Sequence, residues 1–544
     1  MPKTLVSTDL RAGFFVSLIA LPLCLGIAMA SGFPPMSGLI TAIIGGLLVS
    51  RISGTPLTIN GPAAGLIVVV LDAVHTLGGG NTAAGVAYTL AAIVLSGLIQ
   101  IALGVLRAGK LSAFFPSSVV HGMLAAIGII ILVKQSYVLL GAPAETGSIL
   151  QQAMAMPKAI SHLNVPIALI GLTGLAVMIF WPRLPFKFSR MLPAPLWVLC
   201  SGLLLTYYFD LDHIHRYHSV VTQYLTQGDF LIGPDFLLNL PSNPLDALYF
   251  PDFALIGTAK FWFCVFNITL IGSLETLLSA AAVDKLDPKH RCSDLNRDLM
   301  AIGMGNTLCG LVGGLPMIAE IVRSSSNISY GAQSGWANFY HSVFLLLFIS
   351  LGANLIQEIP LASLAALLVY TGFRLASPME FAKTLSIGFG HFLVFVITLI
   401  SILLTDLLLG VLIGIVSELA LHGLRGLKPA QIFQAAYRIE EQEPGNFHVQ
   451  VHGAAVFSNF LALKSITGTL PKGKQVTFDL SETNLIDSTV LEFIYHFRAE
   501  YQRAGGMCEI VGLNQHHAAT KHPLSVRRAR KAQTRMPPLK NPAR

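Results

Sequence analysis

The chain of 544 residues is 53% hydrophobic and only 12% charged, whereas a soluble domain carries about 25% charged residues. This composition excludes an ordinary soluble protein and predicts a polytopic membrane protein. The formal net charge of +7 does not indicate a nucleic-acid partner, because the basic residues gather in short loops and in the C-terminal tail, where they set the orientation of a membrane protein.

Helices that cross a bilayer need about 17–25 mostly apolar residues, and the sequence contains many such segments. They are residues 10–31, 35–51, 83–106, 117–140, 165–181, 192–209, 260–283, 295–313, 337–355, 360–376, 388–404 and 406–424. Two further segments, 60–76 and 321–334, are shorter and are interrupted by Gly, Pro or polar residues. We therefore predict a polytopic α-helical protein of fourteen transmembrane elements.

The interrupted segments stand third and tenth in this order, at the same position in each of two halves of seven. An odd number of spans per half makes the second half enter the membrane from the opposite side, which predicts a 7+7 inverted repeat. Paired broken helices at matching positions indicate a binding site near the bilayer midplane. We predict a transmembrane domain over 1–428, with its repeats at about 1–209 and 258–428.

Loop charges predict the orientation. With the N-terminus inside, the inner loops are rich in Lys and Arg, whereas the outer loops 141–164 and 210–259 hold few basic residues. This bias predicts that both termini are cytoplasmic. The expected location is the plasma membrane, which is the inner membrane in a bacterium.

The two interrupted segments predict a small anion pocket. In the first, Gly61-Pro62 precedes a helix whose first residues, Ala63, Ala64 and Gly65, expose backbone N–H groups without side-chain bulk. A second half-helix that starts near Val322 would face it. Both helix N-termini carry a positive dipole end, which suits an anion. Broken backbone survives at membrane depth only inside protein or beside a water-filled cavity.

Charged and hydroxyl side chains follow the second break. Arg323 is the candidate for holding the anion, since guanidinium groups pair well with planar oxyanions; a structural ion pair with Glu320 is the alternative, and both roles can coexist. Ser324 and Ser325 either cap the half-helix or contact the substrate. Glu320 is either a second coupling carboxylate or only the partner of Arg323.

Glu275 lies inside an apolar segment, where a carboxylate costs roughly 2.5–3.5 kcal/mol on insertion scales. Such a residue is a functional candidate, and the alternative is a structural Glu held by a neighbouring Arg or by serines. Ser279 lies one helical turn further, on the same face. The two side chains could offer oxygen ligands to Na⁺, or Glu275 alone could carry a proton.

After residue 430 the pattern changes to short alternating strands and amphipathic helices, which predicts a small cytoplasmic α/β domain over 436–520. Residues 521–544 are basic, contain no acidic residue and include several prolines; we expect a disordered tail near the anionic inner leaflet. The chain has no nucleophile–base pair, phosphate loop or metal cluster in its sequence pattern. We therefore predict neither an enzyme nor any cofactor beyond a possible coupling Na⁺.

Several motifs together resemble the SulP anion transporters. They are Asp9-Leu-Arg-Ala-Gly13, Ala20-Leu-Pro22, Ala30-Ser-Gly-Phe-Pro-Pro35, Asn60-Gly-Pro62 and Ile321-Val-Arg-Ser-Ser-Ser-Asn327. The C-terminal part resembles a STAS domain through Asp479-Leu-Ser481 and Leu485-Ile-Asp-Ser-Thr489. The resemblance implies two inverted repeats with a core and a gate subdomain, a cytoplasmic STAS domain that can bind a cytosolic partner, and often a homodimer. It also implies transport of inorganic or small carboxylate anions.

The departures from the family pattern concern the substrate and its coupling. Leu23 and Ile27 stand where many members have Gln and an aromatic residue that line the anion site. The stretch around Glu275 resembles the sodium-coupled bicarbonate branch, which has Asp there, while plant sulfate members have Glu and couple to protons. In the STAS domain Val490 replaces the usual Gly, which argues against regulation by phosphorylation of Ser488.

These observations predict a secondary active transporter of a small inorganic anion, bicarbonate or sulfate, coupled to Na⁺ or H⁺ and working by alternating access. The alternatives are an uncoupled exchanger or channel, or a dicarboxylate transporter, on the same fold. A membrane sensor whose output is the STAS domain is a further alternative.

Overall fold

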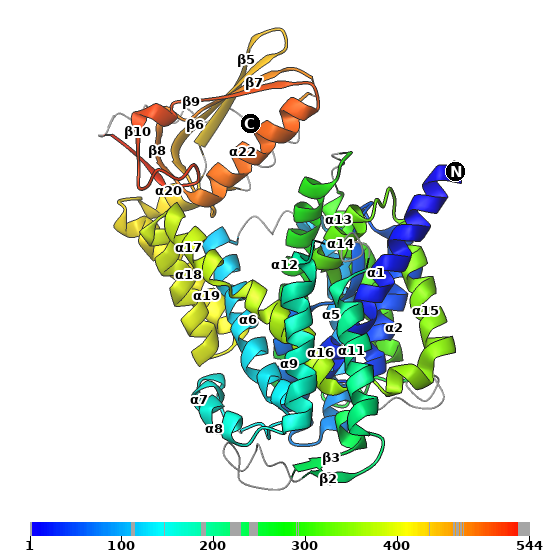
Figure 1. Ribbon diagram of the computed structural model, residues 1–544. Coiled ribbons are helices and arrows are strands. Elements are labelled where there is room, and N and C mark those ends of the chain that lie inside the picture. Colours follow the sequence, from blue (N-terminus) through cyan, green and yellow to red (C-terminus); the bar gives the residue numbers. More distant parts are fainter. Residues whose placement is uncertain are drawn as a thin grey trace. The chain divides into compact units, whose positions relative to one another are not determined.

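A computed structural model describes most of the chain (Figure 1). The described residues are 3–109, 115–145, 147–185, 192–217, 230–238, 248–289, 291, 293–434, 436–460, 463, 467, 470–471 and 473–530. They form two compact units, of which the first comprises 1–112, 124–377 and 403–408, and the second 113–123, 378–402 and 409–544.

Long apolar helices dominate the membrane part, as the hydropathy pattern predicts. The first half contains α1 (Lys3–Ala30), α2 (Pro35–Ile44), η1 (Gly45–Val49), α3 (Ser50–Ile52), β1 (Ile59–Pro62), η2 (Ala64–Leu66), α4 (Ile67–Gly78), α5 (Thr82–Val105), α6 (Ser117–Leu140), α7 (Ile149–Met154), α8 (Met156–Ser161), α9 (Val165–Phe180) and α11 (Ala194–Phe209). A short ribbon of β2 (His215–Tyr217) and β3 (Phe230–Ile232) follows α11.

The second half repeats this order. It contains α12 (Ala259–Leu286), α13 (Leu295–Val312), β4 (Met317–Glu320), α14 (Ile321–Ser329), α15 (Trp336–Gln357), α16 (Leu361–Leu375), α17 (Pro378–Ile387), α18 (Phe389–Leu404) and α19 (Leu407–Leu424). Among the described residues, nine helical spans are long and apolar enough to cross a membrane. The two interrupted elements occupy matching positions in the halves, as predicted.

Close contact between helix backbones holds the first unit together at α5 and α13. A Cβ atom placed on Gly97 would lie 2.5 Å from the backbone nitrogen of Thr307, and one on Gly303 would lie 2.7 Å from the carbonyl oxygen of Gly97. In a membrane, where apolar burial drives helix association little, such small residues let helices pack by direct van der Waals contact. The helices on either side of the interrupted elements are thus fixed against each other.

The motif from Asp9 to Gly13 fastens the start of α1 to the approach of α15. The Asp9 carboxylate accepts hydrogen bonds from the Gln333 backbone N–H at 2.6 Å and from the Ser334 hydroxyl at 2.5 Å. One turn further, a Cβ atom on Gly13 would lie 2.7 Å from the carbonyl oxygen of Ala337. The carboxylate and the glycine therefore set the distance between the two helices.

The C-terminal part is an α/β domain, as predicted. It contains α20 (Pro429–Phe433), β5 (Ala436–Glu443), β6 (Asn446–Ala455), β7 (Gln475–Asp479), β8 (Thr483–Ile486), α22 (Ser488–Arg503), β9 (Met507–Val511), β10 (His516–Ala518) and β11 (Arg527–Ala529). The sheet has the order β10-β11-β8-β6-β7-β9, with β5 also paired to β6. Its core is apolar, with Val449, Phe478 and Ile494 fully buried.

The prediction that the disordered tail begins at residue 521 is wrong for its first residues. Strand β11 pairs antiparallel with both β8 and β10, and Arg527 lies opposite Ile486. The backbone N–H and C=O groups of an arginine-rich segment can join a sheet while the charged side chains reach solvent. Composition alone does not distinguish such a strand from a tail. The rest of the predicted tail, 531–544, lies outside the described residues.

Candidate anion-binding site

The two interrupted elements meet through a small antiparallel ribbon. Strand β1 pairs with β4, with Asn60 opposite Ala319 and Pro62 opposite Met317. Each strand leads directly into a helical segment, η2 with α4 after β1 and α14 after β4. Backbone hydrogen bonds satisfy the extended pieces, as non-helical chain at membrane depth requires. The ribbon brings together the two segments that the sequence predicts to face each other.

Arg323 lies at the junction of these segments and is fully buried. Its guanidinium donates a short hydrogen bond to the carbonyl oxygen of Pro62 and a bond of 3.3 Å to the sulfur of Cys24 on α1. Its Nε lies 3.7 Å from a carboxylate oxygen of Glu320. The predicted ion pair is therefore present at long range, and the cation stands beside the start of the first half-helix.

Glu320, rather than a serine, caps the second half-helix. Its carboxylate accepts a hydrogen bond from the Arg323 backbone N–H at 3.2 Å, which is the N-cap geometry. The Ser324 hydroxyl instead accepts from the Ile59 backbone N–H at 2.9 Å and donates to the Glu320 carbonyl at 2.5 Å, so it fastens β1 to α14. Ser325 is half-buried on the same helix. The alternative of a serine cap is thus wrong, because α14 begins at Ile321, so the N-cap position falls on Glu320 and both serines lie inside the helix.

Glu275, on α12, reaches the start of the first half-helix. Its carboxylate lies so close to Gly65 that a Cβ atom at that position would overlap it. Ala63, Ala64 and Gly65 are all buried, and so is Glu275. The Oε1 atom of Glu275 has no hydrogen-bond partner among the described residues. An unpartnered carboxylate oxygen in a buried position is costly unless a cation or a proton neutralises it.

Replacement of Gly65 by Ala is expected to reduce transport strongly, because the added methyl group and the Glu275 carboxylate cannot occupy the same space. We expect the uptake rate to fall at least about tenfold, since a small displacement of reacting or binding groups already has effects of this size. Initial rates of anion uptake in proteoliposomes measure this, at equal protein incorporation.

Gly423→Ala is the matched control, because a Cβ atom at Gly423 on α19 would meet nothing within 4 Å. This variant is expected to transport like the parent protein. Normal uptake by Gly65→Ala would show that the Glu275 carboxylate does not need its position against the half-helix.

The other candidate residues lie on the two long helices that reach the interrupted segments, α12 and α1. Ser279 is half-buried one turn beyond Glu275, Leu23 is half-buried on α1, and Ile27 is buried on the same helix. Cys24, which lies between Leu23 and Ile27 in the sequence, accepts a hydrogen bond from Arg323 at its sulfur. The first helix therefore contributes to the site, although no sequence pattern singles out Cys24 beyond its place next to Leu23.

A series of hydrogen bonds between buried amide side chains supports the site. The sequence does not predict this series. Asn306 on α13 donates to the Gln100 side chain on α5 at 2.7 Å, and accepts from the Met317 backbone N–H at 2.6 Å. Gln100 in turn donates to Ser273 at 3.2 Å, two residues before Glu275. These hydrogen bonds link α12 to strand β4. The only sequence signal was an isolated amide inside each of two apolar segments, which is also what ordinary helix packing shows.

The comparison with family models agrees with this geometry. Residues 6–398 match the model of the sulfate permease family, which is well over half of the chain. The chain belongs to the sulfate permease family. This membership confirms the predicted resemblance, and it confirms that the protein is a transporter and not an enzyme.

Relatives within the sulfate permease family align over nearly the whole chain. The "Putative sulfate transporter YvdB" of Bacillus subtilis is 24% identical over 513 residues, covering 93% of this chain and 91% of the relative. The bicarbonate transporter BicA of Synechocystis is 25% identical over 521 residues, covering 93% and 88%. The solved transmembrane domain of a cyanobacterial BicA superposes with a TM-score of 0.61 at 24% identity, covering 75% of this chain and 97% of that domain. The fold is therefore that of these membrane transporters.

In the second unit of this sulfate permease family member, Ser488 is buried at the start of α22. Its hydroxyl lies 2.9 Å from Nδ1 of His391 on α18. The preceding Asp487 caps α22 by accepting from the Val490 backbone N–H at 2.8 Å. A modifying enzyme would reach Ser488 only after α22 separates from α18. The prediction that Ser488 is not regulated by phosphorylation stays a prediction.

Proposed function

We propose that the protein is a secondary active transporter of a small inorganic anion, bicarbonate or sulfate, coupled to Na⁺ or H⁺ by alternating access. The observation that supports this most directly is the Glu275 carboxylate against Gly65 at the start of the first half-helix, whose Oε1 atom has no hydrogen-bond partner in the described part of the chain. The anion would bind between that start, at Ala63 to Gly65, and the start of α14. Leu23 and Ile27 of α1 would line the site.

Charge explains why the anion would need a cation. The site contains one guanidinium, Arg323, and two carboxylates, Glu275 and Glu320, so an arriving anion meets a net negative charge. Two like unit charges about 5 Å apart repel by about 3 kcal/mol in a protein environment, which is about a hundredfold in affinity. A proton on Glu275, or Na⁺ at Glu275 with Ser279 as a further oxygen ligand, would remove this repulsion. Glu320 would serve mainly as the cap of α14 and secondarily as a coupling carboxylate.

The names of the relatives support the anion class. One relative is named as a sulfate transporter and another as a bicarbonate transporter, and a guanidinium beside two helix N-termini suits both oxyanions. A dicarboxylate transporter or an uncoupled exchanger or channel on the same fold is the alternative. The Glu275 oxygen that has no partner among the residues the structure describes favours coupling, because a channel has no need of a second binding site that must be neutralised.

The setting of the protein is proposed on the same basis. Both termini would be cytoplasmic in the plasma membrane, since the predicted inner loops hold most of the basic residues. The N-terminus and the β2–β3 ribbon lie at opposite ends of the helices of the first unit (Figure 1), so the ribbon would be external. The C-terminal domain would be a STAS domain that binds a cytosolic partner, and the protein would act as a homodimer.

Radiolabelled uptake into proteoliposomes tests the proposal. Bicarbonate, sulfate and dicarboxylates are offered separately, each under an imposed Na⁺ gradient, an imposed H⁺ gradient, or neither. We expect accumulation of one inorganic anion above its equilibrium level under one of the two gradients only. Ion-independent exchange or a steady current would favour the uncoupled alternative. Absence of flux for every anion would contradict transport and favour a sensor.

A further inference from the structure

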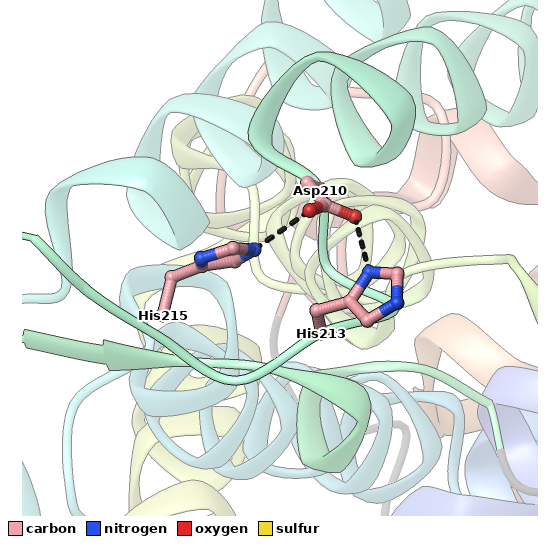
Figure 2. Close-up of side chains that lie close together, drawn as sticks. All are labelled: Asp210, His213 and His215. Carbon is pink, nitrogen blue, oxygen red and sulfur yellow. Dashed lines mark hydrogen bonds and ion pairs between the residues drawn. The ribbon is translucent and has the colours of Figure 1, made fainter.

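One cluster of metal-ligating side chains lies outside the transport site, at the end of α11. Asp210 is the residue that follows this helix, and His213 and His215 follow it within five positions, the latter at the start of β2. The three side chains converge, with both imidazole rings directed at the carboxylate between them (Figure 2). Nothing in the proposed transport mechanism uses them.

The donor atoms are already close to the separation that a metal ion imposes. Asp210 Oδ1 lies 2.9 Å from Nδ1 of His213, and Oδ2 lies 2.7 Å from Nε2 of His215. The potential ligand atoms of the three residues all lie within 4.8 Å of one another. Nitrogen and oxygen ligands at about 2.0–2.1 Å from a tetrahedral zinc ion are about 3.3 Å apart. A small rotation of the carboxylate would therefore admit the ion.

The backbone that carries these residues is anchored, so the cluster is not a chance meeting of free side chains. Asp210 adopts a left-handed conformation with φ of 50°, which ends α11 and turns the chain. Leu211 is fully buried in an apolar cluster together with Ile232 of β3. His215 lies opposite Ile232 in the β2–β3 ribbon. The Asn164 side chain, just before α9, donates to the Leu231 carbonyl at 3.0 Å and ties the ribbon to the helices.

We propose that Asp210, His213 and His215 form a binding site for a divalent transition-metal ion of the zinc class on the loop between the two repeats. Two imidazole nitrogens and one carboxylate supply three ligands, and water would complete a tetrahedral set, as in zinc sites with three protein ligands. The mixed nitrogen and oxygen donors favour zinc and its neighbours over calcium and magnesium, which prefer oxygen alone. The bound ion would hold the end of α11 to the start of β2.

Charge around the cluster is favourable. The Asp210 carboxylate lies within hydrogen-bond distance of both imidazole rings, and it supplies the negative charge that a divalent cation requires. Arg216 follows His215 on β2. Because successive strand residues point to opposite faces, the Arg216 side chain points to the face opposite His215. Metal binding must displace the imidazole protons, so the affinity should fall in acid.

Zinc binding to the purified full-length protein tests the site. Equilibrium dialysis against buffered Zn²⁺, followed by elemental analysis, is expected to show one ion per chain with micromolar or tighter affinity. His213→Ala and His215→Ala are each expected to weaken binding at least about tenfold, because three-ligand sites depend on every ligand. Asp210→Asn should act in the same direction.

Two variants serve as controls. Asp212→Asn removes an exposed carboxylate next to the cluster, and His162→Ala removes an exposed histidine elsewhere in the first unit; both are expected to keep the ion. The visible spectrum of the Co²⁺-substituted parent protein adds a readout that needs no variant, and should show the strong absorption of tetrahedral coordination. No zinc uptake by the parent protein, or equal uptake by the three ligand variants, would overturn the proposal.

Discussion

Replacement of Glu275 by Gln is expected to make anion binding independent of the coupling ion. A glutamine resembles the neutralised carboxylate in shape, so the anion should bind without Na⁺ or H⁺ as tightly as it binds to the parent protein when the ion is saturating. The expected gain in ion-free affinity is about a hundredfold, the size of the repulsion that Glu275 adds. Concentrative uptake should be lost, while exchange of anion for anion persists.

Glu418→Gln is the matched control for this experiment. Glu418 is likewise a buried carboxylate of a membrane helix, α19, but it accepts a hydrogen bond from Ser118 at 2.8 Å. We expect this variant to keep its ion dependence. Initial uptake rates under imposed Na⁺ and H⁺ gradients, at equal insertion into the vesicles, decide the matter. If Glu275→Gln still accumulates the anion in response to the same gradient, Glu275 has no coupling role.

Replacement of Arg323 by Ala is expected to weaken anion binding about 10–100-fold, since charge-assisted hydrogen bonds contribute about 1.5–3 kcal/mol each. The same change also leaves the Pro62 carbonyl without its donor, so the melting temperature should fall as well. Arg323→Lys retains the charge without the planar fork. Arg323→Lys should bind the anion more tightly than Arg323→Ala if the charged group at this position contacts the anion.

The concentration dependence of uptake and the thermal unfolding of the detergent-solubilised protein are measured together for both variants. Arg51→Ala is the control, because Arg51 is exposed and its guanidinium stacks on the Trp336 ring at 3.6 Å. It should leave the affinity for the anion unchanged. A lowered melting temperature with an unaltered affinity in Arg323→Ala would make the arginine a structural residue only.

The sequence predicted the elements of the site better than their connections. Short, Gly- and Pro-interrupted segments at matching positions identified the half-helices, and a carboxylate inside an apolar run identified Glu275, because both features are costly in a membrane. The bonds of Arg323 to Pro62 and Cys24 depend on strand register and on the approach of α1. Neither is encoded in local pattern, so the sequence predicts Arg323 as a candidate but does not predict these two partners.

The remaining differences have similar causes. Glu320 caps α14 because the helix starts three residues before the first serine, and the exact start of a helix is not encoded in residue preference alone. The amides Gln100 and Asn306 act through partners on other helices. Strand β11 forms in a segment whose composition is typical of disorder, since strand pairing uses the backbone and tolerates charged side chains.

The pairing of β1 with β4 also limits how the protein can move. Backbone hydrogen bonds between β1 and β4 join the two half-helices into one rigid body. The two half-helices therefore cannot move apart to release the anion. This rigid body would have to move as a unit relative to the neighbouring helices, together with the bound anion. A covalent staple between positions 60 and 319, which lie opposite each other in the ribbon, should therefore be tolerated during turnover.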